Sequence, residues 1–342
     1  MSELKTVFVT GASGYIAKHI IQQLLDGGYA VRGSVRSDKK ADEVRAAMTA
    51  HVGDPAVLDK LEFVTLDLNA DEGWDAALAG VDVLMHTASP FPLAPPKNEQ
   101  DLIRPAVDGT LRALEAAKGA GVQRVVLTSS VASIQNTELQ AGRNSYNEDD
   151  WSDVNSPTIR SYDKSKTLAE KAAWDFVEEN PKIQLTTINP GFVMGPGLDG
   201  NFGSSLELVQ RIVQGKDPAM PKLSFAIVDV RDIAAMHIRA MERPESIGRR
   251  FIGAAGSMWF GEMAEAVKAR LPDRKITTRI APSWLVRIMA LFDPSIKGVL
   301  SQLGHEVLVD NTAAREVLGM EFIPNAQSIG DAGSFLVDNG YD

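Results

Sequence analysis

The chain has 342 residues, of which 44% are hydrophobic and 23% charged, and it contains no cysteine. The lack of thiols excludes disulfides, thiolate nucleophiles and cysteine metal sites, and the formal net charge of −10 argues against a nucleic-acid partner. No apolar run reaches the length of about 18 residues that a membrane span needs, and the five histidines are scattered, so we expect neither a membrane nor a metal as partner. A strand within the first few residues leaves no room for a signal peptide, which predicts a cytoplasmic protein.

A glycine-rich turn near the start predicts a nucleotide site. The apolar run Val7–Val9 reads as a buried parallel strand, and Ile20–Leu25 carries apolar residues at helical spacing. Between them, Gly11 permits a tight turn, Gly14 allows a close approach of the backbone to a pyrophosphate, and Ala17 allows the helix to pack against the sheet. The free N–H groups at the start of such a helix favour phosphate binding.

The second strand, Ala30–Val35, ends beside the position where a dinucleotide places its adenosine ribose. An acidic residue there would select NAD, but the sequence has Arg36, followed by Lys40. A guanidinium can bind a 2′-phosphate with two hydrogen bonds, so we expect NADPH, with Arg36 as the main contact and Lys40 as a weaker one. Asp38 is expected to cap the helix that runs to Thr49.

Two further strands are expected over Leu61–Leu66 and Val81–His86. His86 reads as a packed core histidine, whereas Thr87, Ala88 and Ser89 follow the carboxyl end of that strand, where ligands bind in open α/β sheets. The proline-rich loop 91–96 either lines a substrate pocket or serves as a connector. The long helix expected over residues 98–118 contains Pro105, which predicts a break or a kink.

The fifth strand, Arg124–Thr128, is followed by Ser129 and Ser130. Tyr162 and Lys166 stand four residues apart at the head of a helix expected over residues 165–176, so one helical face carries both side chains. A free tyrosine has a pKa near ~10, and a neighbouring ammonium together with the charge of an oxidised nicotinamide is expected to lower it. This pair therefore predicts a group that donates a proton to a carbonyl oxygen while hydride reaches the carbon.

A sixth strand, Gln184–Ile188, runs into a turn that contains Pro190, Gly191 and Val193. Beyond Pro196 the alternation of strands and helices weakens, and residues 255–320 are expected to be mostly helical. We predict an α/β fold: a doubly wound parallel sheet of the Rossmann type over residues 1–195, with returning segments near 225–255. A smaller, mostly helical substrate lobe is expected over residues 196–342.

The order of these motifs resembles the extended branch of the short-chain dehydrogenase/reductase superfamily, and within it the dihydroflavonol reductase-like group. The resemblance covers nearly the whole chain. It depends on the glycine turn, on V-R-x-S-V-R at residues 31–36, on T-S-S-V at residues 128–131, on Trp151-Ser152-Asp153, and on the run from Tyr162 to Trp174.

The resemblance implies a Ser-Tyr-Lys mechanism with Ser130, Tyr162 and Lys166 as catalytic residues and Ser129 as the alternative serine. It also implies that Lys166 reaches the nicotinamide ribose, that Asp67 and Leu68 lie at the adenine, and that Pro190 and Val193 contact the carboxamide. The residues expected at the cofactor are Thr10, Gly11, Ser13, Gly14, Tyr15, Ile16, Arg36, Lys40, Asp67, Leu68, Thr87, Ala88, Ser89, Thr128, Ser129, Tyr162, Lys166, Pro190, Gly191, Val193 and Ser204.

Two departures from this group bear on the substrate. The plant flavonoid enzymes have asparagine five residues after the catalytic serine, where this chain has Gln135, and the N-W-Y-C-Y-G-K motif of cinnamoyl-CoA reductases is missing. We therefore expect an NADPH-dependent reductase of small aldehydes and ketones, acting as a monomer or homodimer. The alternatives are dihydroflavonol reduction, a hydroxysteroid or sugar-nucleotide oxidoreductase, and a non-enzymatic NADPH sensor.

Overall fold

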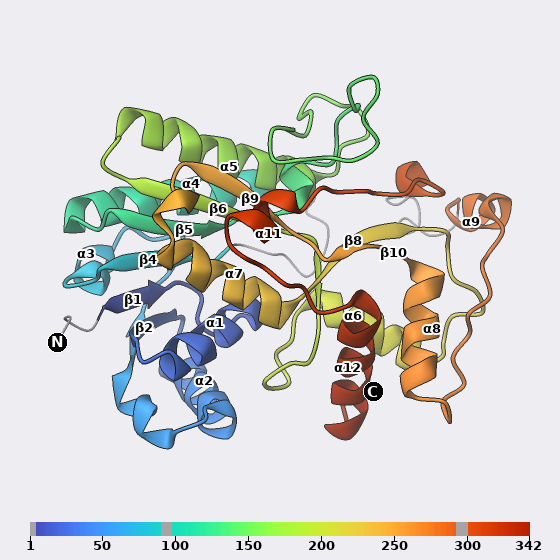
Figure 1. Ribbon diagram of the computed structural model, residues 1–342, viewed down its shortest axis with the longest axis horizontal. Coiled ribbons are helices and arrows are strands. Elements are labelled where there is room, and N and C mark those ends of the chain that lie inside the picture. Colours follow the sequence, from blue (N-terminus) through green and yellow to red (C-terminus); the bar gives the residue numbers. More distant parts are fainter. Residues whose placement is uncertain (1–4, 90–97, 292–299) are drawn as a thin grey trace.

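A seven-stranded parallel sheet forms the centre of the computed structural model, which describes residues 5–89, 98–291 and 300–342 (Figure 1). Its strand order is β3-β2-β1-β4-β5-β6-β9. The strands are β1 (Thr6–Val9), β2 (Ala30–Val35), β3 (Leu61–Thr65), β4 (Val83–His86), β5 (Arg124–Thr128), β6 (Gln184–Pro190) and β9 (Arg249–Gly253). This is the predicted doubly wound sheet, and the first six strands lie within two residues of the bounds expected from the sequence.

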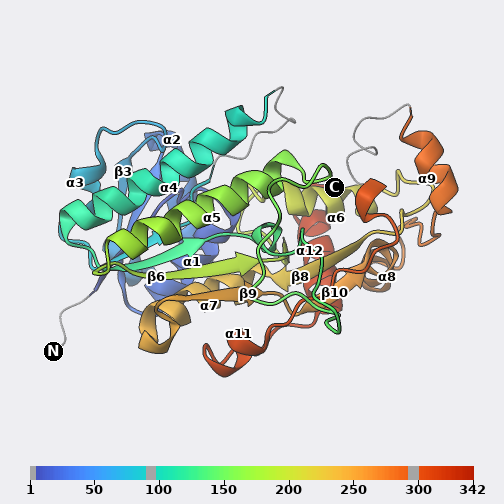
Figure 2. The ribbon, with the colours of Figure 1, turned by 90° about the horizontal axis from the view of Figure 1, so that it is seen from above.

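Helices cover both faces of the sheet (Figure 2). One face carries α1 (Tyr15–Asp26), α2 (Asp38–His51) and α7 (Val230–Glu242), and the other carries α3 (Trp74–Leu78), α4 (Gln100–Ala120) and α5 (Ser161–Glu179). On α1 the buried residues Ile20, Ile21, Leu24 and Leu25 recur at helical spacing and join the first core cluster. The described residues also include the short 3-10 helices η1 (Pro55–Lys60), η2 (Val131–Ser133), η3 (Pro244–Ser246) and, in the C-terminal region, η4 (Leu300–Gln302).

The helix α4 continues through Pro105 without a break, since Pro105 lies in the second turn, close to the helix start; of the predicted break or kink, the kink stays a prediction. One local expectation about the helices was wrong. The N-cap of α2 is Ser37, whose hydroxyl accepts a hydrogen bond from the Lys40 N–H, and Asp38 occupies the first helical position instead.

The order of the strands reverses between β1 and β4, which are neighbours in the sheet although β2 and β3 separate them in sequence. At such a switch point the carboxyl ends of two adjacent strands open a crevice that binds ligands in α/β proteins. Here the glycine-rich turn follows β1 and Thr87 follows β4, so both predicted cofactor segments meet at one place.

A second, three-stranded sheet has the order β10-β8-β7, with β7 (Phe192–Met194) parallel and β10 (Gly256–Trp259) antiparallel to β8 (Ser224–Asp229). It packs with α6 (Ser204–Val213), α8 (Phe260–Arg270) and α12 (Asn325–Asp338), while α9 (Ser283–Met289) and α11 (Thr312–Glu316) are shorter. After β8 the chain returns to the large sheet through α7 and β9, which lie within the range 225–255 where returning segments were expected. The boundary between the two expected lobes at residue 195 stays a prediction.

The described part of the segment 255–320 is less helical than expected. Besides its helices it contains β10 and the irregular stretches 271–282 and 303–311. Distant backbone partners hold these stretches: Met220 pairs with Ile280, and the Tyr146 N–H donates to the carbonyl of Leu308 over 2.9 Å. Because these partners lie far apart in sequence, no periodic pattern within either stretch predicts them.

Within the three described ranges, no helix combines the length and the apolar content needed to cross a membrane.

Candidate active site

The glycine-rich turn has the geometry of a phosphate-binding loop. Gly11 has a φ of +66°, and a Cβ there would lie only 3.1 Å from Ala88 on the neighbouring strand end, so both the backbone conformation and the tight contact disfavour a side chain. Its N–H donates to the Ser34 hydroxyl over 2.9 Å, a contact that sequence reasoning missed. No side chain caps α1 at Gly14, which leaves the N–H groups of the helix start available to an anion.

Thr10 does not offer its hydroxyl to a ligand. The oxygen accepts hydrogen bonds from the N–H groups of Thr87 and Ala88, both at 3.0 Å, and lies 2.9 Å from Nδ1 of His86. Thr10 therefore fixes the end of β4 against β1, and His86 is buried, as the sequence predicted. The Tyr15 hydroxyl is likewise used internally, since it donates to the Gly195 carbonyl over 2.8 Å.

The end of β2 presents an exposed guanidinium. Arg36 has no hydrogen bond or ion pair to any residue that the structure describes, whereas Lys40 pairs with Glu43 at 2.5 Å. Of the two predicted contacts, Arg36 is thus uncommitted at the position where a 2′-phosphate was expected, and Lys40 is not. Farther along, Asp67 accepts the N–H of Asn69 over 2.9 Å at the end of β3.

Tyr162, Ser130 and Lys166 come together between α5 and the end of β5. The helix α5 starts at Ser161, four residues earlier than predicted, so Tyr162 stands in its first turn and Lys166 in its second. A hydrogen bond joins the hydroxyls of Ser130 and Tyr162. The Lys166 Nζ lies 5.9 Å from the centre of the Tyr162 ring.

The two serines after β5 point to different partners. The Ser130 side chain accepts a hydrogen bond from Ala132 at the start of η2 and faces Tyr162, whereas the Ser129 hydroxyl donates to the buried Glu170 carboxylate over 2.5 Å. Thr128 is also turned inward, with its hydroxyl 2.7 Å from Nε2 of His237. Of the two candidate serines, only Ser130 touches the tyrosine.

Burial raises the pKa of Tyr162 above its ordinary value, and the hydrogen bond from Ser130 opposes this only in part. The predicted lowering of this pKa combined the Lys166 ammonium with the charge of an oxidised nicotinamide, and it stays a prediction; in the protein alone, burial outweighs the nearby charges. Burial also lowers the pKa of Lys166 to about 8, against the opposing influence of the Glu170 carboxylate. Tyr162 therefore keeps its proton at neutral pH.

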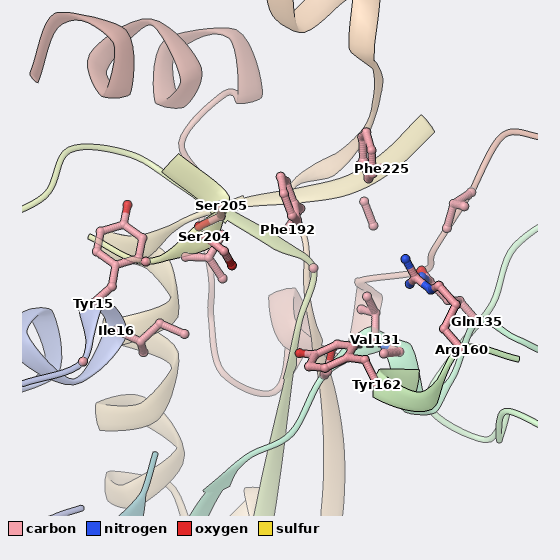
Figure 3. Close-up of a pocket in the computed structure, with 18 of the residues that line it drawn as sticks. Tyr15, Ile16, Val131, Gln135, Arg160, Tyr162, Phe192, Ser204, Ser205 and Phe225 are labelled. Carbon is pink, nitrogen blue, oxygen red and sulfur yellow. Dashed lines mark hydrogen bonds between the residues drawn. The ribbon is translucent and has the colours of Figure 1, made fainter. Parts of the chain in front are cut away.

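A cavity of about 540 Å³ joins the glycine turn to Tyr162. Figure 3 shows Tyr15 and Ile16 at one end, Gln135 and Arg160 at the other, and the Tyr162 hydroxyl directed into the space between them. Ten of the expected cofactor and catalytic residues line it: Gly11, Gly14, Tyr15, Ile16, Thr87, Ser130, Tyr162, Gly191, Val193 and Ser204.

The other expected residues do not line this cavity. Ala88, Ser89, Thr128, Ser129 and Lys166 border a much smaller cavity beneath it. Thr10, Ser13, Arg36, Lys40, Asp67, Leu68 and Pro190 border neither of the two. The loop 91–96, expected to be either a pocket wall or a connector, lies outside the described residues.

Sequence reasoning missed most of the far end of the cavity. Phe192 and Phe225 stack there with ring centres 5.2 Å apart, and Gln302 and Val307 come from the C-terminal region. Arg160 binds the Asp163 carboxylate through Nε and Nη2, each at 2.8 Å. The position of Arg160, two residues before Tyr162, is the one sequence signal that could have identified it as a residue of the site.

No group of three or more histidine, aspartate or glutamate side chains that could hold a metal ion occurs in residues 5–89, 98–291 and 300–342.

Known proteins that are similar to this chain in sequence or structure include several reductases. A model of the NAD dependent epimerase/dehydratase family matches residues 7–252. A ketoreductase of Aspergillus niger is 33% identical over 352 residues, covering 98% of each chain, and an anthocyanidin reductase of Vitis vinifera is 33% identical over 288 residues, covering 80% of this chain and 83% of that one. The crystal structure of yeast methylglyoxal/isovaleraldehyde reductase Gre2 complexed with NADPH has a TM-score of 0.80 at 30% identity, covering 98% of this chain and all of the other.

Proposed function

The chain belongs to the NAD dependent epimerase/dehydratase family, and from this premise we propose that it is an NADPH-dependent reductase of small aldehydes and ketones. The observation that carries the proposal is the Ser130–Tyr162 hydrogen bond at the wall of a cavity that begins at a phosphate-binding turn. A relative of similar structure, the yeast reductase Gre2, was solved with NADPH bound.

The residues at the site fit NADPH. The turn at Gly11 disfavours a side chain, the start of α1 lacks a side-chain cap, and Arg36 is exposed at the end of β2. We assign the pyrophosphate to the turn and the 2′-phosphate to Arg36. When bound, NADPH supplies the hydride for the carbonyl carbon.

Tyr162 would serve as the acid of the reaction. Its raised pKa keeps the hydroxyl protonated at neutral pH, so it can give that proton to the carbonyl oxygen of the substrate. The Ser130 hydroxyl would donate a hydrogen bond to the same oxygen and stabilise its developing charge. The Lys166 ammonium would then stabilise the phenolate that remains.

The substrate would lie at the end of the cavity formed by Phe192 and Phe225, with Arg160 and Gln135 as the polar groups there. These rings favour small carbonyl compounds with an apolar part. The similarity to a plant anthocyanidin reductase supports flavonoid reduction as the second candidate. Oxidation of NADPH by purified protein, measured with small aldehydes, ketones and dihydroflavonols, separates the two: turnover of flavonoids alone would refute our substrate assignment.

The proposed acid can be tested with Tyr162→Phe, which removes one oxygen atom from the cavity wall. We expect kcat/KM for a small aldehyde to fall by about 10²- to 10⁴-fold, because proton transfer loses its donor. The matched control is Tyr146→Phe, since the Tyr146 hydroxyl donates to the Thr137 carbonyl and does not line the cavity. Wild-type rates in Tyr162→Phe would overturn the mechanism.

We also propose a cytoplasmic location and either a monomeric or a homodimeric state. Fractionation of cells and light scattering of the purified protein would test these two points.

A further inference from the structure

His86 has a buried ring nitrogen that lacks a partner. The residue ends β4 with 2% of its surface exposed, and its Nδ1 lies 2.9 Å from the Thr10 hydroxyl. Its Nε2 has no hydrogen-bond partner among the residues that the structure describes. A buried polar atom in this state costs free energy unless something satisfies it.

The hydrogen bonds of Thr10 determine the tautomer of His86. A hydroxyl oxygen has two acceptor lone pairs and one proton to donate. The backbone N–H groups of Thr87 and Ala88 occupy both lone pairs, so the Thr10 proton must go to Nδ1 of His86. The ring proton therefore sits on Nε2, and the atom without a partner is a donor that needs an acceptor.

The space next to this donor is the smaller of the two cavities. It measures about 10 Å³, and its lining includes His86, Thr110, Ser129, Lys166 and Glu170. This is close to the volume that one buried water molecule requires. An ammonium group only donates hydrogen bonds, so Lys166 cannot accept the His86 proton directly.

We propose that one water molecule binds in this cavity, accepts hydrogen bonds from His86 Nε2 and Lys166 Nζ, and thereby positions the Lys166 ammonium. One of its own protons can go to the Thr110 oxygen, which lines the same cavity. His86 is then a positioning residue that acts on Lys166 through the water, on the side of the ammonium away from the large cavity. The importance of Lys166 for turnover rests on the proposed function.

The groups around Lys166 are few, which makes its pH dependence interpretable. On α5 it faces Tyr162 and Glu170, and on β4 it faces His86, whose pKa burial lowers to about 3, so that ring stays neutral. The cavity residues of α4 and β5 carry no charge. Arg250 of β9 is bound to Glu170, and His237 of α7, kept neutral by burial, is bound to Thr128.

The first test uses the wild-type protein and needs no activity. Nitrogen-15 NMR of labelled histidine, with the His86 signals assigned by their loss in His86→Gln, is expected to show the proton on Nε2. A high-resolution crystal structure is expected to show one water within hydrogen-bond distance of His86 Nε2 and Lys166 Nζ. A proton on Nδ1, or an empty cavity, would overturn the proposal.

The second test compares His86→Gln, which keeps an N–H donor near the position of Nε2, with His86→Leu, which has none. In His86→Leu the alkaline limb of the kcat/KM profile for a neutral aldehyde should move to lower pH by about one unit, because Lys166 loses an acceptor for its charged form. The limb of His86→Gln should stay near that of the wild type. Equal limbs in both variants would contradict the role of the water.

The two tests fail independently. If the wild-type protein reduces no carbonyl compound, the proposed function fails, while the NMR and crystallographic result still decides whether the water binds. If His86→Leu does not fold, the NMR and crystallographic results on the wild-type protein still decide whether the water binds.

Discussion

Glu170 shows how a single buried side chain can fix several parts of the candidate site. Its carboxylate accepts hydrogen bonds from Ser129, Ser133, Thr187 and Asn189 and pairs with Arg250 at 2.7 Å. Burial alone would raise the pKa of Glu170, but Arg250 and these donors hold it below its usual value. The ionised carboxylate thus joins the serine loop after β5, the end of β6 and β9.

Removing this charge should destabilise the fold. Glu170→Gln leaves the Arg250 guanidinium buried without its counter-charge, so we expect the free energy of unfolding in urea to fall by about 3–5 kcal/mol. The matched control is Glu178→Gln on the exposed side of the same helix, which should change stability by less than about 0.5 kcal/mol. Similar losses in both variants would show that the network contributes little.

The exposed Arg36 predicts the cofactor preference. In Arg36→Asp an acidic group replaces the proposed contact to the 2′-phosphate, which repels NADPH and can bind the ribose hydroxyl of NADH instead. We expect the ratio of kcat/KM for NADPH over NADH to fall by at least about tenfold, which corresponds to about 1.4 kcal/mol. Arg104→Asp is the control, because Arg104 is exposed on α4, which covers the other face of the sheet from α2. An unchanged ratio in Arg36→Asp would mean that other residues bind the 2′-phosphate.

At the scale of elements, Asp232 links the start of α7 to the C-terminal segment. Its carboxylate accepts the Ile323 N–H over 2.8 Å, and burial raises its pKa to about 6. Because this value lies above the ordinary one of about 3.9, the folded state resists the ionisation of Asp232. The resulting cost to stability is small below about pH 4, grows between about pH 4 and 6, and is complete above that range.

Asp232→Asn keeps an acceptor for the Ile323 N–H but cannot ionise. We therefore expect this variant to be more stable than the wild type by roughly 2–3 kcal/mol at pH 7, with the difference shrinking toward zero near pH 4. Urea denaturation across this pH range measures it, with Asp175→Asn, an exposed site on α5, as the control. A difference that does not vary with pH would contradict the role of ionisation.

The elements predicted well from sequence are those with local signals. The glycine turn, the first six strands and the Tyr162–Lys166 pair each depend on neighbours within one helical turn or one strand, and the structure places them as expected. The second sheet and the far wall of the cavity carry no such signal. Phe192 and Phe225 come into contact because β7 pairs with β8. Neither segment contains a local sequence pattern that predicts this pairing.

Side-chain directions were the other part that sequence could not supply. Thr10, Ser129 and Thr128 lie in the predicted segments, yet internal partners bind their hydroxyls. The pKa of Tyr162 depends on burial in a related way. The motif gives the spacing of the pair but not the burial, which decides the balance.

At the scale of the whole molecule, the large cavity belongs to no single stretch of the chain. The glycine turn supplies one end, the segment after β5 and the start of α5 supply the middle, and β7, β8 and the C-terminal region close it. A bound nucleotide would therefore touch parts of the chain far apart in sequence. Its binding should stabilise the whole fold and not one half of it.

The pairing of β6 with β9 has a consequence for attempts to shorten the protein. Residues 186–190 pair with residues 249–253, so a fragment that stops at residue 195 would expose an unpaired strand edge that is buried in the full chain. Exposed edges of this kind pair with other chains, so we expect fragment 1–195 to aggregate on expression, whereas the full chain stays soluble. A soluble, monodisperse fragment in size-exclusion chromatography would show instead that the first 195 residues form an autonomous unit.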